Sequence, residues 1–238
     1  FSDREKAARD ADFFNALLRD SGIPWLGEVP KHWDIPSLKM RYTVELGKML
    51  DERKIIGDQL IPYLRNTDIQ WDRINFDELP EMDISEDEYL RYTIREHDVL
   101  VCEGGEVGRS AIVGKCDAVI GYQKALHRLR AEKSNEIPRF IYYTLLWAVS
   151  TGVFSVEGAS TIAHLTADQL RRYRFPQPPE TEQQDIVVFL DKTVGRLENM
   201  LQKTNMAITR LTEYRTALIT AATTGKIDVR QIEIPAQA

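Results

Sequence analysis

The first candidate for chemistry is the run from Glu103 to Arg109, which places three glycines directly after an apolar stretch. It reads Glu-Gly-Gly-Glu-Val-Gly-Arg. A nucleotide-binding P-loop would have to end in Gly-Lys-Ser/Thr, and a dinucleotide-binding loop would have to open a helix. The run meets neither condition, and its two glutamates would repel a bound phosphate. We therefore favour a tight turn or hairpin in which glycine supplies a positive φ angle.

Other catalytic and metal-binding patterns are missing from the sequence. The four histidines have no metal-ligand spacing, and Cys102 and Cys116 are too far apart for a zinc knuckle. No Gly-x-Ser-x-Gly nucleophile motif occurs. The Asn/Asp-Pro-Pro-Tyr/Phe motif of adenine methyltransferases is also absent, because residues 177–180 read Gln-Pro-Pro-Glu. We expect no catalytic residue, no metal and no cofactor in this chain.

The charge of the chain is unevenly distributed. The net charge is −6, which is unusual for a DNA-binding protein. Residues 72–106 carry twelve acidic and three basic side chains, whereas residues 107–147 carry seven basic and three acidic ones. A basic face could therefore follow phosphates while the acidic segment faces elsewhere. The alternative is that these are ordinary solvated surface charges.

A strand-rich domain, residues 1–178, is needed to position these groups. The pattern predicts a short amphipathic helix over 2–20 and strands at 60–64, 98–102 and 110–113. Pro138 fits the first position of a helix over 138–150, and Thr166 with Gln169 fits a capping box. We therefore predict an α+β fold with mixed or antiparallel strands. The longest apolar stretch is too short to cross a bilayer, and two cysteines do not form a disulfide framework, so we expect a reducing cytoplasm.

A second domain, residues 179–238, begins at the end of the stiff Phe-Pro-Gln-Pro-Pro linker at 175–179. Thr181 is the predicted N-cap of a helix that runs from about 182 to 222, and Gly225 the predicted C-terminal cap. Such a helix is about 60 Å long at about 1.5 Å per residue.

Apolar residues recur along this helix at spacings of four and three, which predicts a coiled-coil seam. Thr204 and Arg215 interrupt it. The alternative is a helix folded back on its own domain, although that domain is too small to cover the whole seam. The predicted interface residues are Leu190, Val194, Leu197, Leu201, Ile208, Leu211 and Leu218.

Four segments together resemble one known family. They are residues 25–33 (Trp-Leu-Gly-Glu-Val-Pro-Lys-His-Trp), 98–109, 158–183 and the closing helix at 214–228. In this order, and over nearly the whole chain, they resemble the specificity subunits of type I restriction-modification systems. Each segment alone is a weak signal, and the set is specific.

The resemblance implies a non-catalytic DNA-recognition subunit. A complete subunit of that family has two target-recognition domains and two conserved helices, so this chain resembles one half. The helices pack antiparallel and bind methyltransferase subunits, while S-adenosylmethionine, ATP and Mg²⁺ belong to the methyltransferase and restriction partners. The expected target is a bipartite double-stranded DNA site. An antiparallel pair, formed by a homodimer or a second half, would act as a ruler for its spacer of at most about 18 base pairs at about 3.4 Å per step.

The residues that would contact DNA do not carry over from the family, because its recognition domains vary. Arg and Lys can bind guanine, and Gln or Asn adenine, while hydroxyl groups suit phosphates. The alternative for each residue is surface solvation or loop capping. The candidates are Arg65, Asn66, Arg109, Tyr122, Gln123, Lys124, Arg128, Arg130, Ser160 and Thr161.

Two other functions remain open at this point. The chain could be a helical scaffold whose domain binds no DNA, or a nuclease that acts alone. Affinity for DNA that falls with salt separates the first from DNA recognition, and metal-dependent cutting by the purified chain identifies the second.

Overall fold

The computed structural model describes residues 17–50, 57, 59–154 and 164–228. The chain divides into two compact units, residues 1–187 and 188–238, and each is described by itself. The boundary between the units falls inside a long helix, whereas the boundary predicted from the sequence lies in the proline linker after residue 178. The predicted division of functions between two domains stays a prediction.

The first unit is organised by a four-stranded antiparallel sheet in the order β3-β11-β8-β9. Its strands are β3 (Tyr42–Leu46), β8 (Val99–Cys102), β9 (Ser110–Ile112) and β11 (Leu126–Ala131). All four residues of β8 are buried, because both faces of the sheet are covered. Val99 and Val101 belong to one core cluster, and Leu100 and Cys102 to another, as the alternation of side chains along a strand requires.

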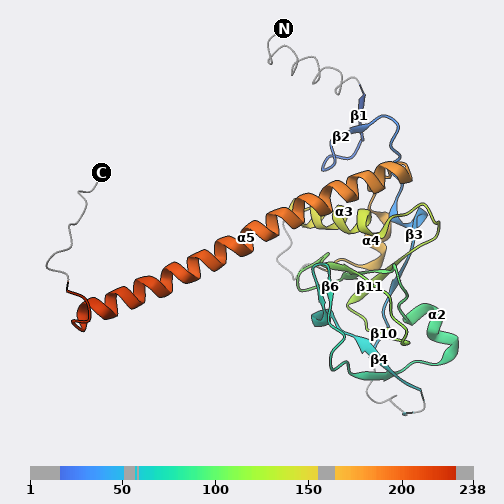
Figure 1. Cartoon of the computed structure of the whole chain (residues 1–238). Helices are drawn as coiled ribbons and strands as arrows, with labels where there is room; N and C mark the ends of the chain where they lie inside the picture. Colours follow the sequence, from blue (N-terminus) through green and yellow to red (C-terminus); the bar gives the residue numbers. More distant parts are fainter. Residues whose placement is uncertain (1–16, 51–56, 58, 155–163, 229–238) are drawn as a thin grey trace, which may run out of the picture. The chain divides into compact units, whose positions relative to one another are not determined.

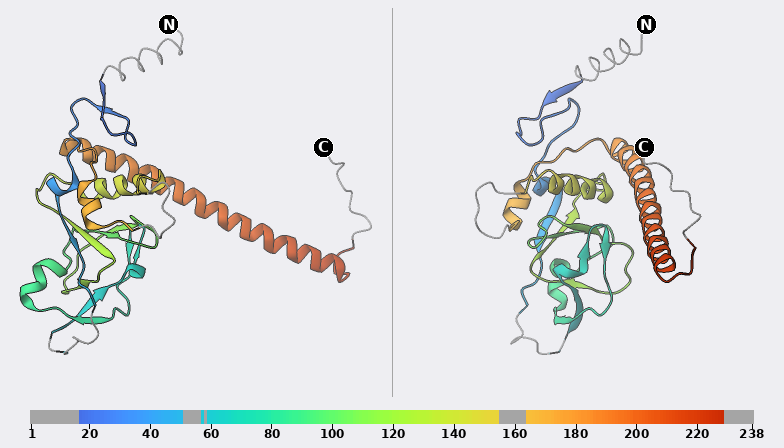
Figure 2. Two further views of the ribbon diagram at one scale, coloured as in Figure 1. Left: turned by 180° about the vertical axis from the view of Figure 1, so that it is seen from behind. Right: turned by 90° about the vertical axis from the view of Figure 1, so that its left-hand side faces the viewer.

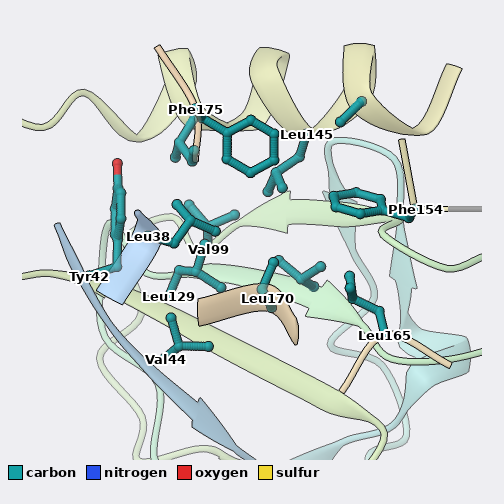
Figure 3. Close-up of a cluster of buried hydrophobic side chains, with 13 residues drawn as sticks. Leu38, Tyr42, Val44, Val99, Leu129, Leu145, Phe154, Leu165, Leu170 and Phe175 are labelled. Carbon is teal, nitrogen blue, oxygen red and sulfur yellow. The ribbon is translucent and has the colours of Figure 1, made fainter. Parts of the chain in front are cut away.

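Two helices contribute to the first core cluster, α3 (Pro138–Ser150) and α4 (Ala167–Arg172). Figures 1 and 2 show α3 lying across the sheet. In Figure 3, Leu145 of α3 and Phe175 lie between the helix and the strands that carry Val99 and Leu129. Both predicted starts are confirmed: Pro138 is the first residue of α3, and the Thr166 side chain caps α4 by accepting a hydrogen bond from the Gln169 amide.

A second sheet lies against the second core cluster. Its order is β10-β4-β7, with β4 (Leu60–Leu64) parallel to β10 (Gly121–Tyr122) and antiparallel to β7 (Glu81–Asp83). Two small hairpins complete the strands, β1–β2 (Leu18–Asp20, Glu28–Pro30) and β5–β6 (Ile69–Gln70, Arg73–Ile74). The α2 helix (Tyr89–Tyr92) and the 3-10 helices Leu38–Met40, Asn66–Asp68 and Glu86–Glu88 link them. The α+β prediction is confirmed.

The helix predicted over residues 2–20 is wrong where the structure describes it. Residues 1–16 lie outside the described part, and Leu18–Asp20 form β1. The physical reason is non-local pairing, since Arg19 lies opposite Val29 in an antiparallel ladder. The local amphipathic pattern carries no information about that partner.

The long helix α5 spans Glu180–Thr223, 44 residues. It starts one residue before the predicted N-cap Thr181, which is therefore wrong as a cap: the helix begins directly after Pro179, whose carbonyl already accepts from the Gln183 amide at 3.0 Å. Gly225 closes the other end with a φ angle of +70°, as predicted. Residues 180–187 belong to the first unit. No described helix is long and apolar enough to cross a membrane.

Candidate nucleic-acid interface

Four loops meet where β3, β4, β8 and β10 end. Because β4 and β10 are parallel, the loops that follow them leave the sheet side by side, and the Gln123 amide donates to the Leu64 carbonyl at 3.0 Å. The loop after β8 joins them, since the Glu103 amide donates to the Ala125 carbonyl at 2.9 Å. The Lys124 amide donates to the Lys48 carbonyl at 2.8 Å. We call residues 47–48, 65–68, 103–109 and 123–125 the rim loops.

The glycine run forms the hairpin between β8 and β9, which confirms the turn rather than the phosphate loop. The Cys102 amide donates to the Arg109 carbonyl at 2.8 Å, and the Gly108 amide to the Cys102 carbonyl at 3.0 Å. Gly108 has a φ angle of +85°, and a Cβ atom there would lie 2.6 Å from a methyl of Val149. Glycine is therefore required by both backbone and packing.

Arg109 connects this hairpin with the loop after β4. Its Nη2 atom donates to the backbone and side-chain oxygens of Asn66, both at 3.1 Å, and Nη1 lies 3.4 Å from a Glu106 carboxylate oxygen. The Asn66 amide group in turn donates to the Gly104 carbonyl at 2.9 Å. Arg109 and Asn66 therefore hold two rim loops together, and most of their hydrogen-bonding groups face each other.

Arg65 is held by a neighbour that sequence reasoning missed, Asp68. The Nε and Nη2 atoms of Arg65 donate to the two carboxylate oxygens at 2.9 and 2.8 Å, and its backbone amide donates at 2.7 Å. Burial acts to raise the pKa of Asp68, but these hydrogen bonds outweigh it and lower the pKa. The Arg65 side chain is still 40% exposed. The i,i+3 spacing of an Arg and an Asp was the available signal.

The turn at 123–125 presents Gln123 and Lys124. Lys124 is exposed, and no ion pair forms to it among the residues that the structure describes. Ala125 takes a positive φ angle of 98°. Gly47 lies directly against this turn, and a Cβ atom there would sit 2.2 Å from the Gln123 carbonyl oxygen. Gly47 was also missed, because only the tertiary contact requires glycine.

Tyr122, Arg128 and Arg130 do not fit the predicted role. The Tyr122 ring is buried and its hydroxyl donates to the Arg91 carbonyl at 2.9 Å. Arg128 is 2% exposed, and its Nη1 atom donates to the carbonyls of Leu90, Arg91 and Thr93. Arg130 forms a two-point ion pair with Asp98 at 2.8 and 2.7 Å. The prediction is corrected for these three, because Tyr122 of β10 and Arg128 and Arg130 of β11 anchor the segment around α2.

The other predicted DNA contacts, Ser160 and Thr161, lie outside the described residues. The chain that follows them returns to the rim, where the Leu165 amide donates to the Glu103 carbonyl at 2.8 Å. The His164 ring lies over Gly104, at 3.3 Å from where a Cβ atom would be.

The predicted basic face is partly neutralised by the acidic segment. Arg109, Arg130 and Arg139 of the basic segment pair with Glu106, Asp98 and Asp72 of the acidic one. Net charge along the sequence therefore overstates the charge on the surface, because the two segments pack together. At the rim, Lys48 pairs with Glu88, which leaves Lys124 and the outer edge of Arg65 as the accessible cationic groups.

Metal-binding geometry is not found in the part of the chain that was described. No group of three or more His, Cys, Asp or Glu side chains could hold a metal ion among those residues. Cys102 is buried and Cys116 half-buried, and both are free thiols. Burial raises the pKa of Cys102, although nearby Arg109 opposes this, so the thiol is a poor nucleophile.

The predicted seam residues of α5 are half-buried near the start of the helix and exposed from Leu197 onward. Leu190 and Val194 are half-buried. Phe189, Met200 and Tyr214, which the seam did not include, are exposed as well. Leu197, Leu201, Ile208, Leu211 and Leu218 are 55, 63, 56, 67 and 45% exposed. A coiled coil with a partner helix stays a prediction.

Comparison with known proteins gives a consistent result. Residues 43–209 match the family model described as the type I restriction modification DNA specificity domain. The type I restriction enzyme EcoBI specificity subunit of Escherichia coli is 24% identical over 177 residues, which are 72% of this chain and 37% of that protein.

Two solved structures share the fold. One is from a study of complex assembly and conformational transition of the type I R-M system; it has a TM-score of 0.65 and 17% identity, over 92% of this chain and 53% of that one. The other is the HsdS subunit from Thermoanaerobacter tengcongensis, with a TM-score of 0.55 and 16% identity, over 82% of this chain and 46% of that one. The chain thus spans about half the length of these relatives, or less.

Proposed function

The chain belongs to the family of type I restriction modification DNA specificity domains, and from that premise we propose that its first unit reads one half of a bipartite DNA site through the rim loops. The observation that carries this proposal is the convergence of Arg65, Gln123 and Lys124 at one edge of the sheets, from loops far apart in the sequence. Loops held by a rigid scaffold are where recognition residues are most often found.

Each of the three side chains suits a different contact. Asp68 holds the Nε edge of Arg65, which leaves Nη1 and the outer hydrogen of Nη2 for the O6 and N7 atoms of a guanine. The side chain of Gln123 can pair with an adenine, and Lys124 with a phosphate. Because Asp68 fixes the guanidinium group before binding, less side-chain entropy is lost on DNA.

The small number of accessible cations implies a shallow salt dependence. The affinity of a DNA-binding protein falls with salt by a log–log slope of about −0.9 for each phosphate neutralised. If the described rim cations Lys48, Arg65, Arg109 and Lys124 all contacted phosphates, they would contribute a slope of about −4 per copy. Substitution Lys124→Ala should make the slope shallower by about 1 and weaken binding to all sequences alike.

The role proposed for α5 is assembly. Its exposed apolar side chains suit antiparallel pairing with a second copy or another half, and docking of methyltransferase subunits. With 44 residues the helix is about 66 Å long, which limits the spacer between half-sites to about 19 base pairs. Methyl transfer with S-adenosylmethionine, and cleavage with ATP and Mg²⁺, are proposed for the partner subunits and the restriction subunit, not for this chain.

The test is methylation by a methyltransferase subunit of the type I class, produced with and without this chain and read by sequencing modified adenines. Sequence-specific methylation that requires the chain supports the proposal, and a palindromic motif indicates a homodimer. Methylation that is identical without the chain contradicts the proposal and favours the alternative that the chain is a helical scaffold that binds no DNA. Metal-dependent cutting by the purified chain alone identifies a nuclease.

Substitutions in the rim loops test whether these loops determine the methylated sequence. Arg65→Ala should relax specificity at one base pair, worth about 1–3 kcal/mol of discrimination. Lys115→Ala is the matched control, because this exposed lysine follows β9 at the end of the strand opposite the rim. If Lys115→Ala changes the motif and Arg65→Ala does not, the rim is the wrong surface.

A further inference from the structure

A buried polar cluster lies where the linker passes into α5. Its centre is the carboxylate of Glu136, which accepts hydrogen bonds from Nε and Nη2 of Arg41 at 2.8 and 2.7 Å. The Tyr42 hydroxyl donates to it at 2.8 Å, and the Gln177 side chain at 2.6 Å. Both charged side chains are 1% exposed. Four donors therefore fix one carboxylate inside the protein.

The same cluster reaches the first turn of the helix through Gln183, which is fully buried. Its side-chain oxygen accepts from the Ile137 amide at 3.1 Å, and its side-chain nitrogen donates to the carbonyls of Pro178 at 2.9 Å and Asn135 at 3.3 Å. One side chain of α5 thus bonds to the linker before it and to the segment that carries Glu136. We call Arg41, Glu136, Gln177 and Gln183 the helix mount.

A second contact holds the outside of the same turn. Glu182 accepts from the Trp33 indole nitrogen at 2.8 Å and lies 2.7 Å from the His32 ring nitrogen. These hydrogen bonds lower the pKa of Glu182, so the carboxylate stays charged at neutral pH. The first turn of α5 is therefore held on two sides by polar contacts.

Buried polar contacts of this kind can specify the orientation of the groups that they join more than they stabilise the fold. Removing a charged pair from water is costly, and apolar side chains of similar volume often stabilise a fold equally well. Apolar packing, however, accepts small rotations, whereas matched donors and acceptors are satisfied in one orientation. The hydrogen bonds of the mount are thus satisfied together in the observed orientation of the first turn of α5.

The length of α5 magnifies any change at its base. The helix has 44 residues, so at about 1.5 Å per residue a tilt of about 5° displaces its far end by about 6 Å, nearly two base-pair steps of about 3.4 Å. A small change of helix direction at Gln183 thus displaces the far end of α5 by about as much as a change of one or two base pairs in the spacer.

We propose that the helix mount consists of positioning residues that fix the direction in which α5 leaves the first unit, and that this restricts the spacer length accepted between two half-sites. The direction is a property of the chain itself, while the effect on spacer length rests on the function proposed above. The two parts are tested separately.

The first experiment measures the direction without DNA. Spin labels are placed at Asp87→Cys in the first unit and Arg196→Cys on α5, both exposed, with Cys116→Ser. Pulsed dipolar spectroscopy is run on labelled full chain diluted in unlabelled chain, so that only distances within one chain count. We expect a narrow distance distribution, and one at least twofold wider for Gln183→Met, which keeps the volume and loses all three hydrogen bonds. Gln184→Ala, an exposed neighbour, is the control and should leave the width unchanged.

A second variant guards against loss of folding. If Gln183→Met unfolds the first unit, Glu182→Ala removes the outer contact at a half-buried position and should still widen the distribution. An unchanged width in every folded variant overturns the proposal, whatever the DNA results are.

The second experiment measures spacing in the complex with a methyltransferase partner. DNA carrying the half-sites at different separations is methylated by wild type and Gln183→Met. We expect wild type to prefer one spacer, and the variant to accept spacers one or two base pairs longer or shorter with the same half-site sequence. A wider distance distribution with no change in spacer preference overturns the link to spacing. Absence of sequence-specific methylation by wild type refutes the proposed function. In that case the first experiment alone tests whether the helix mount fixes the direction of α5.

Discussion

Similar side chains are buried in the first unit and exposed on α5. Leu129 of the sheet is completely buried, whereas Leu211 of α5 is 67% exposed. Arg41 and Glu136 satisfy each other inside the first unit, whereas most large apolar side chains of α5 beyond Val187 are exposed in the described part of the chain. Burial of one leucine side chain is worth about 1.5–3 kcal/mol. The first unit obtains that free energy from its own residues, whereas the exposed apolar side chains of α5 would obtain it only by pairing with a further helix, as proposed above.

This difference can be measured because the two regions have separate signals. All four tryptophans, Trp25, Trp33, Trp71 and Trp147, belong to the first unit. Tryptophan fluorescence in urea therefore reports the free energy of unfolding of that unit alone. Sedimentation reports association, which we assign to α5. The predictions below are ordered by their expected effect on the first unit.

The largest effect is expected for Glu136→Ala. The substitution leaves the Arg41 guanidinium buried without a counter-charge and removes an acceptor from Tyr42 and Gln177. Breaking a buried ion pair costs about 3–5 kcal/mol. The urea midpoint followed by fluorescence should fall accordingly. Glu96→Ala, an exposed acid, should change the free energy by less than about 0.5 kcal/mol. Equal effects of the two substitutions would show that the pair contributes nothing.

A smaller loss is expected for Gly108→Ala in the hairpin after β8. The φ angle of +85° disfavours any side chain, and the new Cβ atom would lie 2.6 Å from Val149 and 2.7 Å from Phe154. Overpacking of a core typically costs about 1–3 kcal/mol. Gly114→Ala is the matched control, because nothing lies within 4 Å of its Cβ position and no positive φ is needed there. If both variants unfold at the wild-type urea concentration, the strain at Gly108 is absent.

The sequence predicts the elements with strong local signals and misses those defined by distant partners. Pro138, the Thr166 cap and the uninterrupted helical pattern of α5 are local, and each was predicted close to its place. The β1 strand was predicted as helix, because its pairing with β2 lies about ten residues away. The parallel pairing of β4 with β10, which brings Arg65 to Lys124, spans almost sixty residues and has no local signature.

The candidate site shows the same limit. Arg128 and Arg130 were chosen from the basic segment 107–147, and the structure places both on β11. Their burial follows from the segment around α2, whose carbonyls accept their hydrogen bonds. A single sequence shows that a residue is charged but not whether its partner is DNA or its own backbone. Exposure, which only the tertiary structure gives, separates Lys124 from Arg128.

The third prediction concerns the pH dependence of the first unit. His127 is buried; its Nε2 atom can only donate to the Leu165 carbonyl, at 2.6 Å, so Nδ1 is the unprotonated atom, and it has no partner. Burial lowers the pKa of His127 below its ordinary 6.5. The unfolded chain therefore takes up a proton near pH 6.5 that the folded chain refuses, and stability is lost as the pH falls below that value.

The measurement compares urea midpoints at pH 7.5 and 5.5 for wild type and His127→Gln, which keeps an N–H donor toward Leu165. The drop between the two pH values should be smaller in the variant. Asp68 and Glu88, whose pKa values are lowered, lose their contribution only at more acidic pH, so they do not interfere in this window. The same drop in both proteins would mean that His127 does not cause it.

The smallest effect on the first unit is expected for Leu211→Glu, and this result sharpens the comparison most. An exposed leucine contributes little within its own chain, so the fluorescence-detected free energy should change by less than about 0.5 kcal/mol. If the apolar stripe of α5 pairs with another helix, the same substitution should shift the chain toward monomer in sedimentation, because a charge would be buried at the seam. Met206→Glu is the matched control: it lies 51% exposed on α5, two residues before Ile208 and so about 200° around the helix from the seam. Association lost in both variants would indicate nonspecific contact, and association kept in both would place the partner on another face, whereas loss in Leu211→Glu alone identifies the seam as the surface that a second chain must complete.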